Sequence, residues 1–338
     1  MEETTPPTFE ATPVPPSEIR PAPFPVFREL ALLAGVLVSV FFLPYLYSQA
    51  KAPIADATAN MRAPQATTLR VPESAPSIPD ASVFEHIALL GKTSAVYDVS
   101  RGEFLYTQGS DTVLPIASIT KIMTALVAYE LMRDLDTVIT IPPPTTDEYS
   151  PLAIGDTFTA RELLDYTLLV SSNEGARAIA ITAAKSALGN EATMDDFVRA
   201  MNIRARTLGL THTSFKNVTG LDIGENPGAI SSAEDVAKLL AYITTTYPDL
   251  LAVTQASEKT FVGTKKLIYE AKNTNGVVRN IPGLIASKTG FETSAGGTLA
   301  VAFNAGLDRI IVVVVLGSTW SGRFDDILEL VTKTQLSL

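Results

Sequence analysis

The hydrophobic pattern changes twice before a globular pattern begins. Residues 1–29 are rich in Pro, Glu and Thr and lack apolar periodicity, so we expect a disordered tail. Residues 30–47 read LALLAGVLVSVFFLPYLY without a charge. As a helix they would span about 27 Å, close to the roughly 30 Å hydrocarbon core of a membrane. Residues 48–84 are rich in Ala, Pro and Thr, which predicts a semi-extended tether.

The apolar segment at 30–47 has two membrane interpretations. It is apolar on every face, unlike a core helix that buries one stripe. The small residues Ser48 and Ala50 fit the spacing that a signal peptidase cleaves, so a removed signal peptide is the alternative. The leader before the segment is long and only modestly basic. We therefore expect an uncleaved, single-pass transmembrane anchor.

Residues 85–338 have the pattern of a folded domain. Short apolar or alternating runs predict strands near both ends, and capped, longer segments predict helices between them. The expected strands are 94–99 and 103–108, joined as a hairpin, and 265–272, 285–289, 297–303 and 309–316. The expected helices are 118–135, 174–188 and 194–208, one opening at the capping box 159–162, one capped at 231–234, and one from 324. This order predicts an α+β fold, a mainly antiparallel sheet with a helical subdomain.

Composition narrows the functional classes. A chain of 338 residues with 46% hydrophobic residues can hold one domain of about 250 residues plus appendages. The net charge of −10 argues against nucleic acid as the main partner. The chain has no cysteine and only two histidines, His86 and His212, which argues against zinc and iron–sulfur sites. We expect no metal and no cofactor, and we interpret both histidines as structural or surface residues.

Ser118 and Lys121 are the first candidate catalytic pair. In a helix, residues three apart share one face, so the hydroxyl and the amine would be neighbours. A serine becomes a nucleophile beside a base, and a lysine with a lowered pKa can be that base. The same spacing recurs at Ser48 and Lys51, so this motif carries little weight by itself.

Two further polar motifs follow in the chain. Residues 171–173, Ser-Ser-Asn, lie between two expected helices, where they would form a turn or simply the N-cap of the second helix. Residues 288–290, Lys-Thr-Gly, lie at the expected end of an apolar strand. They offer a charge, a hydroxyl and backbone clearance to a bound carboxylate, or form an ordinary strand and glycine turn. Gly91-Lys92-Thr93 is no phosphate-binding loop, because His86 stands where that loop needs glycine.

In this order the three motifs resemble the Ser-x-x-Lys, Ser-x-Asn and Lys-Thr-Gly motifs of penicillin-binding proteins and serine β-lactamases. The surrounding sequence resembles low-molecular-mass D-alanyl-D-alanine carboxypeptidases over nearly all of 85–338. The similar segments are PIASITKIMTALVAYE at 115–130, LLVSSNEGA at 168–176, MNIRARTLGLTHTSFKNVTGLD at 201–222, SKTGFETSAGGTLA at 287–300 and LGSTWSGRFDD at 316–326. One departure is Thr219, where the family usually has histidine. We interpret it as a change in loop packing.

The resemblance implies a β-lactamase/transpeptidase-like fold, a central antiparallel sheet flanked by helices with an inserted helical subdomain. It implies that Ser118 is the nucleophile, Lys121 its base and Ser171 a proton relay, and that Asn173 positions Lys121 and the substrate. Backbone N–H groups of Ser118 and Phe291 would form the oxyanion hole. The implied substrate-binding residues are Lys288, Thr289, Gly290, Phe291 and Arg323. Arg323 has an alternative role, an ion pair with Asp325 or Asp326.

The implied activity is that of a serine-type D-Ala-D-Ala carboxypeptidase, which removes the terminal D-alanine of peptidoglycan stem peptides and is acylated by β-lactams. Cell-wall biogenesis and cell shape would depend on this activity. The catalytic domain is expected outside the cytoplasm of a bacterial cell, held to its membrane by residues 30–47. Three alternatives stay open: an endopeptidase that cuts cross-links, a β-lactamase, and a β-lactam-binding sensor or scaffold without turnover. The motifs do not distinguish a carboxypeptidase from an endopeptidase, and no deacylating glutamate motif indicates a β-lactamase.

Overall fold

The computed structural model describes residues 81–132, 134–143 and 151–338. The expected tail, the apolar segment 30–47 and most of the tether lie outside these residues. The first described element is the short 3-10 helix η1 (Ala81–Phe84), which begins before the expected domain boundary at 85. Its Phe84 side chain is buried and stacks on Tyr106, so this turn belongs to the folded domain. No helix in the described ranges has the length and apolar character to cross a membrane.

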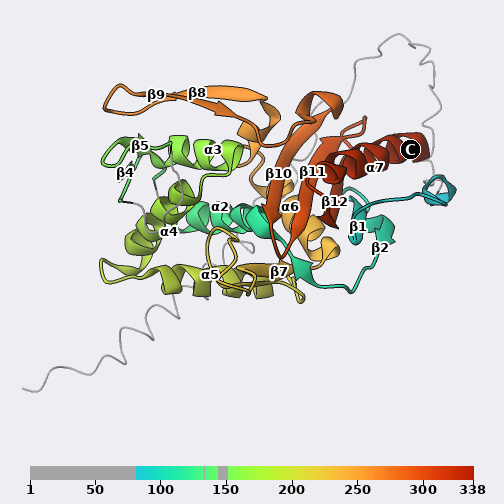
Figure 1. Cartoon of the computed structure of the whole chain (residues 1–338), viewed down its shortest axis with the longest axis horizontal. Helices are drawn as coiled ribbons and strands as arrows, with labels where there is room; N and C mark the ends of the chain where they lie inside the picture. Colours follow the sequence, from blue (N-terminus) through green and yellow to red (C-terminus); the bar gives the residue numbers. More distant parts are fainter. Residues whose placement is uncertain (1–80, 133, 144–150) are drawn as a thin grey trace, which may run out of the picture. The chain divides into compact units, whose positions relative to one another are not determined.

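A five-stranded antiparallel sheet connects the two ends of the domain (Figure 1). Its strand order is β10-β11-β12-β1-β2. The strands are β1 (Thr93–Asp98), β2 (Glu103–Gln108), β10 (Leu284–Glu292), β11 (Gly296–Asn304) and β12 (Ile310–Ser318). The expected hairpin is present as β1 and β2, and β1 also pairs with β12, with Val96 opposite Val313. The predicted antiparallel sheet is therefore confirmed.

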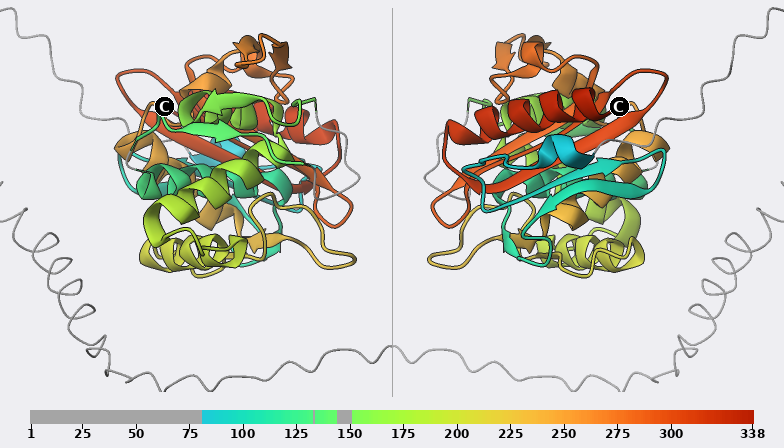
Figure 2. Two further views of the ribbon diagram at one scale, coloured as in Figure 1. Left: turned by 90° about the vertical axis from the view of Figure 1, so that its left-hand side faces the viewer. Right: turned by 90° about the vertical axis from the view of Figure 1, so that its right-hand side faces the viewer.

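Both faces of the sheet are covered, which explains the continuous apolar runs of its central strands. Helix α6 (Ala233–Thr246) packs on one face, and α7 (Gly322–Ser337) with η1 packs on the other (Figure 2). Because side chains alternate along a strand, β12 contributes to two cores. Val312, Val314 and Leu316 lie in the core on the α6 side. Ile311, Val313 and Val315 lie in the core under α7.

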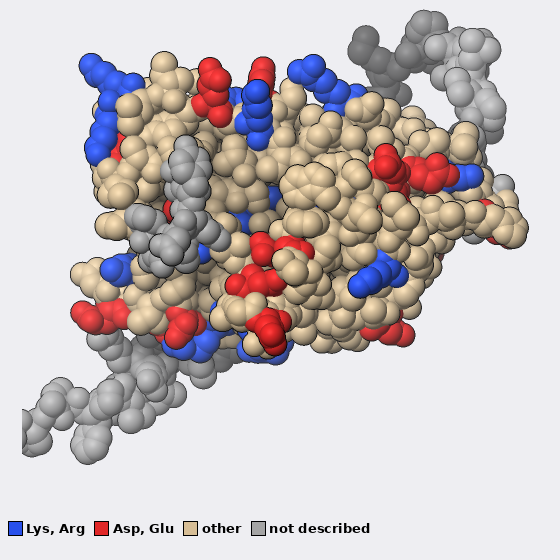
Figure 3. Space-filling model, in the orientation of Figure 1, with Lys and Arg blue, Asp and Glu red and all other residues tan. Residues whose placement is uncertain are grey.

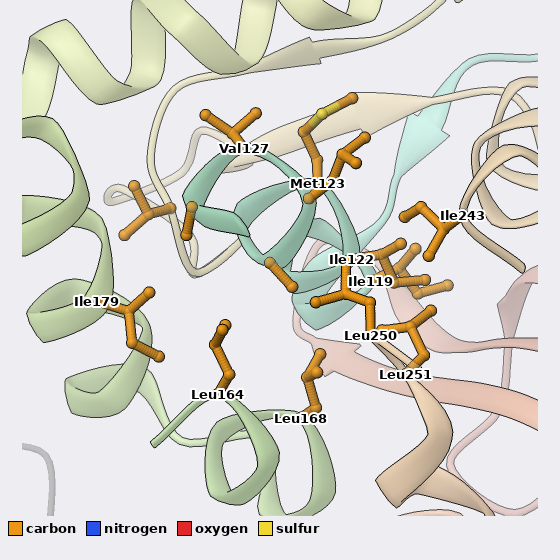
Figure 4. Close-up of a cluster of buried hydrophobic side chains, with 14 of the residues drawn as sticks. Ile119, Ile122, Met123, Val127, Leu164, Leu168, Ile179, Ile243, Leu250 and Leu251 are labelled. Carbon is orange, nitrogen blue, oxygen red and sulfur yellow. The ribbon is translucent and has the colours of Figure 1, made fainter. Parts of the chain in front are cut away.

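The helical subdomain surrounds one buried helix, α2 (Thr120–Leu131). Residues Thr120–Ala128 are all buried, the polar Thr120, Lys121 and Thr124 included. Helices α3 (Ala160–Val170), α4 (Asn173–Leu188) and α5 (Met194–Thr207) pack around it. Figure 4 shows side chains of α2 facing Leu164 and Leu168 of α3 and Ile179 of α4. The predicted inserted helical subdomain is thus present.

Several helix boundaries differ from those predicted. The expected helix 118–135 is a 3-10 turn, η2 (Ala117–Ile119), followed by α2, which ends at Leu131. The capping box at Thr159 and Glu162 is confirmed, and Ser232 caps α6 by accepting the N–H of Asp235. Gly189 ends α4 with φ 100° and ψ 168°, a backbone conformation that glycine tolerates.

Shorter strands complete the described fold. The expected strand 265–272 is β9 (Ile268–Lys272), which pairs with β8 (Glu258–Val262) in a separate hairpin rather than in the central sheet. The other short strands are β3 (Leu114–Pro115), β4 (Val138–Thr140), β5 (Thr157–Thr159), β6 (Ser214–Phe215) and β7 (Ala229–Ser231). Two 3-10 turns, η3 (Ala252–Gln255) and η4 (Val278–Asn280), flank the β8–β9 hairpin in sequence.

Candidate active site

Ser118 lies in η2, at the entrance to the buried helix α2. The residue before it, Ala117, has φ +48°, a left-handed conformation that costs free energy in a residue with a Cβ. Strain of this kind persists where the surrounding structure imposes it, often at functional sites. Here Thr120 Oγ1 donates to the Ala117 carbonyl at 2.7 Å. The turn therefore holds Ser118, which is half-buried, directly before the first turn of α2.

The Lys121 amine is held by three oxygens. Its Nζ lies 2.8 Å from Ser118 Oγ, 2.8 Å from Asn173 Oδ1 and 2.9 Å from the Thr219 carbonyl oxygen. The side chain is 1% exposed. The amide and carbonyl oxygens can only accept hydrogen bonds, so they orient two N–H groups of the amine. The remaining tetrahedral direction of the Lys121 nitrogen then faces the Ser118 hydroxyl. In a neutral amine the lone pair would occupy this direction and could accept the Ser118 proton.

The Ser-Ser-Asn motif serves the site and the fold together. Ser171 ends α3 in a left-handed conformation with φ +64°. Ser172 is the N-cap of α4, and its Oγ accepts the N–H of Gly175 at 3.0 Å. Asn173 is the first residue of α4. The N-cap interpretation is therefore correct for Ser172, and the same turn presents Ser171 and Asn173 to the lysines.

Lys288 joins the sheet to this turn. Its Nζ donates to Ser171 Oγ at 3.0 Å and to the Thr289 carbonyl at 2.9 Å. The side chain is 2% exposed. Burial holds the pKa of Lys288 well below its ordinary value, and the charges of Lys121 and Arg323 lower this pKa further. Two lysines thus lie within hydrogen-bonding distance of two serines in one largely buried polar cluster.

The Lys-Thr-Gly motif lies inside β10, so its predicted place at the end of the strand is wrong. Pairing with β11 continues through Gly290 opposite Thr298 and Phe291 opposite Gly297. A Cβ at Gly290 would lie 2.9 Å from the Ser118 nitrogen and 2.5 Å from Thr298 Oγ1. A side chain cannot fit there, so glycine lets β10 pass close to the turn that carries Ser118.

Phe291 and Arg323 border the same end of β10. Phe291 is 43% exposed, and its ring meets Trp320 edge-to-face at 4.8 Å. Arg323 is 2% exposed, and its Nη1 donates to the Gly290 carbonyl at 2.7 Å. Burial lowers the pKa of Arg323 to about 10. The alternative ion pair of Arg323 with Asp325 or Asp326 is absent from the described residues, and the Asp326 carboxylate instead accepts the N–H groups of Leu90 and Gly91 and the Ser318 hydroxyl.

A sequence model of peptidase family S11, described as D-alanyl-D-alanine carboxypeptidase, matches residues 82–319. The chain belongs to this family. A D-alanyl-D-alanine endopeptidase of Pseudomonas aeruginosa is 33% identical over 234 residues, which are 67% of this chain and 71% of the relative. The carboxypeptidase DacF of Bacillus subtilis is 31% identical over 257 residues, 71% of this chain and 61% of that protein.

Solved structures of the same kind share the fold. Penicillin-binding protein D2 of Listeria monocytogenes, in its ampicillin-bound form, is 27% identical with a TM-score of 0.61, and the match covers 73% of this chain and 98% of the other. A variant of the Streptomyces K15 DD-transpeptidase is 26% identical with a TM-score of 0.66, covering 75% and 100%. The S11 domain of this chain therefore has the penicillin-binding-protein fold expected from its motifs.

Sequence reasoning missed several contacts of the S11 site. It singled out Thr219 for loop packing, but the Thr219 backbone carbonyl is an acceptor for Lys121. Asn217 Oδ1 shapes that loop by accepting the N–H groups of Thr219 and Gly220 at 3.1 and 2.7 Å. A turn-forming Asn217 with a glycine three residues later, Gly220, is the signal that the sequence offers. Thr289 Oγ1 donates to Thr274 Oγ1 at 2.6 Å, and no motif pointed to Thr274.

Charged and metal-binding groups elsewhere are less concentrated. Figure 3 shows one group of acidic side chains near the middle of the face, with other acidic and basic side chains scattered over the rest of it. Among residues 81–132, 134–143 and 151–338, no group of His, Asp or Glu side chains has a metal-binding arrangement. Gly91, from the rejected phosphate-loop motif, donates its N–H to the Asp326 carboxylate and so has a structural contact.

Proposed function

We propose that this protein is a serine-type D-Ala-D-Ala carboxypeptidase that removes the terminal D-alanine of peptidoglycan stem peptides through an acyl-enzyme on Ser118. The observation that carries this proposal is the buried Lys121 amine, which Asn173 and Thr219 orient toward Ser118. An oriented base next to a hydroxyl is the arrangement that nucleophilic catalysis requires.

Two neighbouring lysine charges disfavour each other, so acylation starts from the state in which Lys121 is neutral and Lys288 carries the proton. Ser118 Oγ attacks the carbonyl carbon of the penultimate D-alanine while its proton passes to the Lys121 amine. The N–H groups of Ser118 and Phe291 would stabilise the oxyanion, as the close passage of β10 at Gly290 allows. In a serine protease one such donor contributes about 3–4 kcal/mol to transition-state stabilisation. Collapse of the tetrahedral intermediate breaks the peptide bond and leaves an ester on Ser118.

The leaving D-alanine nitrogen needs a proton, and Ser171 is placed to deliver it. Its hydroxyl accepts from Lys288 Nζ at 3.0 Å, so the second lysine can replace the proton that the serine gives away. The terminal carboxylate would lie beside Lys288 and Thr289. Arg323 supports that region through the Gly290 carbonyl. Lys121, protonated in acylation, then passes its proton through solvent to the Lys288 amine, which gave one up. Water attacks the ester while its proton passes to the neutral Lys121, and the Ser118 oxygen leaves with that proton.

The test is release of free D-alanine from a pentapeptide that ends in D-Ala-D-Ala. We expect Ser118→Ala to abolish release and Ser48→Ala, at the second Ser-x-x-Lys, to leave it unchanged. Mass spectrometry of the intact protein with excess penicillin should show one added drug mass on the peptide that contains Ser118. Equal activity of the Ser118→Ala protein would refute the assignment, and rapid multiple-turnover hydrolysis of the drug would favour a β-lactamase.

A DD-endopeptidase is the second candidate, because the Pseudomonas aeruginosa relative carries that name. The two activities differ in whether the scissile D-Ala-D-Ala bond ends at a free carboxylate or continues into a cross-link. A cross-linked muropeptide dimer and a pentapeptide monomer, offered in one reaction, would give their relative kcat/KM values directly. A sensor or scaffold without turnover would form the penicillin adduct and release no product from either substrate.

We further propose that the catalytic domain works outside the cytoplasm and that residues 30–47 anchor it to the cell membrane. The uncharged length of the segment and the location of peptidoglycan support this arrangement. Protease added to cells with a permeabilised wall should cut the tether at 51–82. Cleavage only after membrane lysis would reverse the orientation, and a mature protein that starts near residue 51 would make the segment a signal peptide.

A further inference from the structure

Thr274 places a second hydroxyl beside Thr289 in the region proposed for the substrate carboxylate. Thr289 Oγ1 donates to Thr274 Oγ1 at 2.6 Å. Thr289 is 4% exposed, whereas Thr274 is half-buried, so Thr274 is the more accessible of the two. We propose that Thr274 is a further substrate-binding residue, whose hydroxyl acts with that of Thr289 to hold the free carboxylate. This inference rests on the proposed function and identifies how its substrate end is recognised.

The backbone around Thr274 is tied to the end of α3. The Thr274 N–H donates to the Leu169 carbonyl at 3.1 Å, and Leu169 precedes Ser171 by two residues. Ser171 in turn accepts a hydrogen bond from Lys288, the neighbour of Thr289. The Thr274 hydroxyl therefore lies between the Ser-Ser-Asn turn and the Lys-Thr-Gly strand, where the leaving residue of the substrate would lie.

A second set of contacts fixes the same loop to η3. Asn273 Nδ2 donates to the carbonyls of Thr254 and Ala256, both at 2.8 Å, and its Oδ1 accepts the N–H of Asn275. Thr254 Oγ1 accepts the Ser287 N–H at 2.9 Å, which ties η3 to β10. The loop that carries Thr274 and the strand β10 that carries Thr289 are therefore both hydrogen-bonded to η3. The two threonine hydroxyls are held in place before a ligand arrives, which limits the ordering entropy lost on binding.

In the free protein the Thr289 hydroxyl donates to the Thr274 hydroxyl oxygen. A carboxylate has two oxygens and can accept from both hydroxyls at once. Binding then exchanges one neutral hydrogen bond for two charge-assisted ones, each roughly twice as strong. Arg323 is 2% exposed and donates to the strand backbone at Gly290, so it supports this region through β10.

The test compares Thr274→Val, which removes the hydroxyl, with Thr274→Ser, which keeps it. Each full-length protein is assayed on a D-Ala-D-Ala peptide with a free carboxylate and on the same peptide as a C-terminal amide. We expect Thr274→Val to raise KM for the carboxylate peptide about tenfold, equivalent to about 1.4 kcal/mol, and to change the amide reaction little. Thr274→Ser should behave as the unmodified protein with both peptides.

A second readout keeps this inference separate from the proposed function. Acylation by benzylpenicillin, with its free carboxylate, is compared with acylation by the methyl ester of the drug. Thr274→Val should slow the first about tenfold and the second little. The exposed Thr260→Val on β8 is the matched control and should alter neither reaction.

Equal effects of Thr274→Val on the charged and neutral ligands, or no effect on either, would overturn the role of Thr274. An unmodified protein that is acylated but releases no D-alanine would refute the carboxypeptidase proposal, and the acylation rates would still decide about Thr274.

Discussion

At the scale of residues, the site depends on backbone conformations that few side chains tolerate. Ala117 and Ser171 both have positive φ, and both adjoin or form the polar cluster. Gly220 has φ +82°, and a Cβ there would lie 1.9 Å from the Ala117 carbonyl oxygen. The loop that supplies the Thr219 carbonyl to Lys121 therefore packs directly on the turn that supplies Ser118.

This close contact predicts that Gly220→Ala impairs catalysis. The new methyl group must push the Thr219 loop away from Ala117, and displacement of a catalytic group by about 1 Å can cost about 100-fold in rate. We expect a loss of that order in penicillin acylation, measured by stopped-flow. The control is Gly209→Ala, because Gly209 has φ +71° with no heavy atom within 4 Å. It should lose about 1–2 kcal/mol of stability and keep its acylation rate. Similar acylation rates in both variants would contradict the packing argument.

The buried Lys288 predicts a pH dependence of stability. Its pKa in the folded protein lies well below 10.5, because of burial and the charges of Lys121 and Arg323. Between that value and 10.5 the unfolded chain binds more protons than the folded protein, so stability rises with pH and is lost as pH falls through the folded pKa. Urea unfolding should show the unmodified protein gaining stability relative to Lys288→Gln as pH rises toward 10.5. The exposed Lys216→Gln is the control and should show no such trend.

At the scale of elements, most of what the sequence predicts comes from local chemistry. The β1–β2 hairpin, the capping box at Thr159 and the helix 194–208 follow from residues next to each other in the chain, and the structure has all three within a residue or two. The extension of β10 beyond residue 289 could not be predicted in this way. It depends on pairing with β11, which begins at Gly296, a residue that gives no strand signal of its own.

The Ser-Ser-Asn turn predicts that neighbouring serines have different functions. Ser172→Ala removes the N-cap of α4 and should cost about 1 kcal/mol of stability while activity is retained. Ser171→Gly keeps the left-handed backbone, since glycine adopts φ +64° without strain, but removes the hydroxyl that contacts Lys288. Its kcat for D-alanine release should fall by about 100-fold or more, as for loss of a proton-transfer group. Urea titration and steady-state kinetics of both variants measure the two effects, and a reversed pattern would reverse the roles.

At the scale of the whole molecule, the decisive contacts join distant parts of the sequence. Thr93 of β1 lies opposite Leu316 of β12, and Lys288 reaches Ser171. The local pattern predicts that β1 lies beside β2, but no local pattern encodes that β12 lies beside β1, so the full order β10-β11-β12-β1-β2 could not be derived from periodicity. The prediction that the three motifs form one site came from their resemblance to a known family. Thr274 carries no motif, and only the folded chain brings it to Thr289.

The core under α7 predicts that stability and catalysis can be separated across the sheet. Phe84 is 5% exposed and belongs to that core, whereas Ile116 and Ile119 beside Ser118 belong to the core on the opposite face. Phe84→Ala should destabilise the protein by about 3 kcal/mol, because it removes a buried ring at the edge of a packed cluster. Its kcat/KM for D-alanine release should stay unchanged under conditions where the protein is folded.

Leu336→Ala on α7 is the matched control, since Leu336 is 69% exposed and should contribute less than about 0.5 kcal/mol. Urea unfolding gives both stabilities, and peptide kinetics below the unfolding transition give both activities. A Phe84→Ala protein with unchanged stability would exclude η1 from the folded domain. A folded Phe84→Ala protein with strongly reduced turnover would instead mean that packing under α7 sets the position of β10, because β11 connects that core to the strand that carries Lys288. The two-core arrangement predicts neither result.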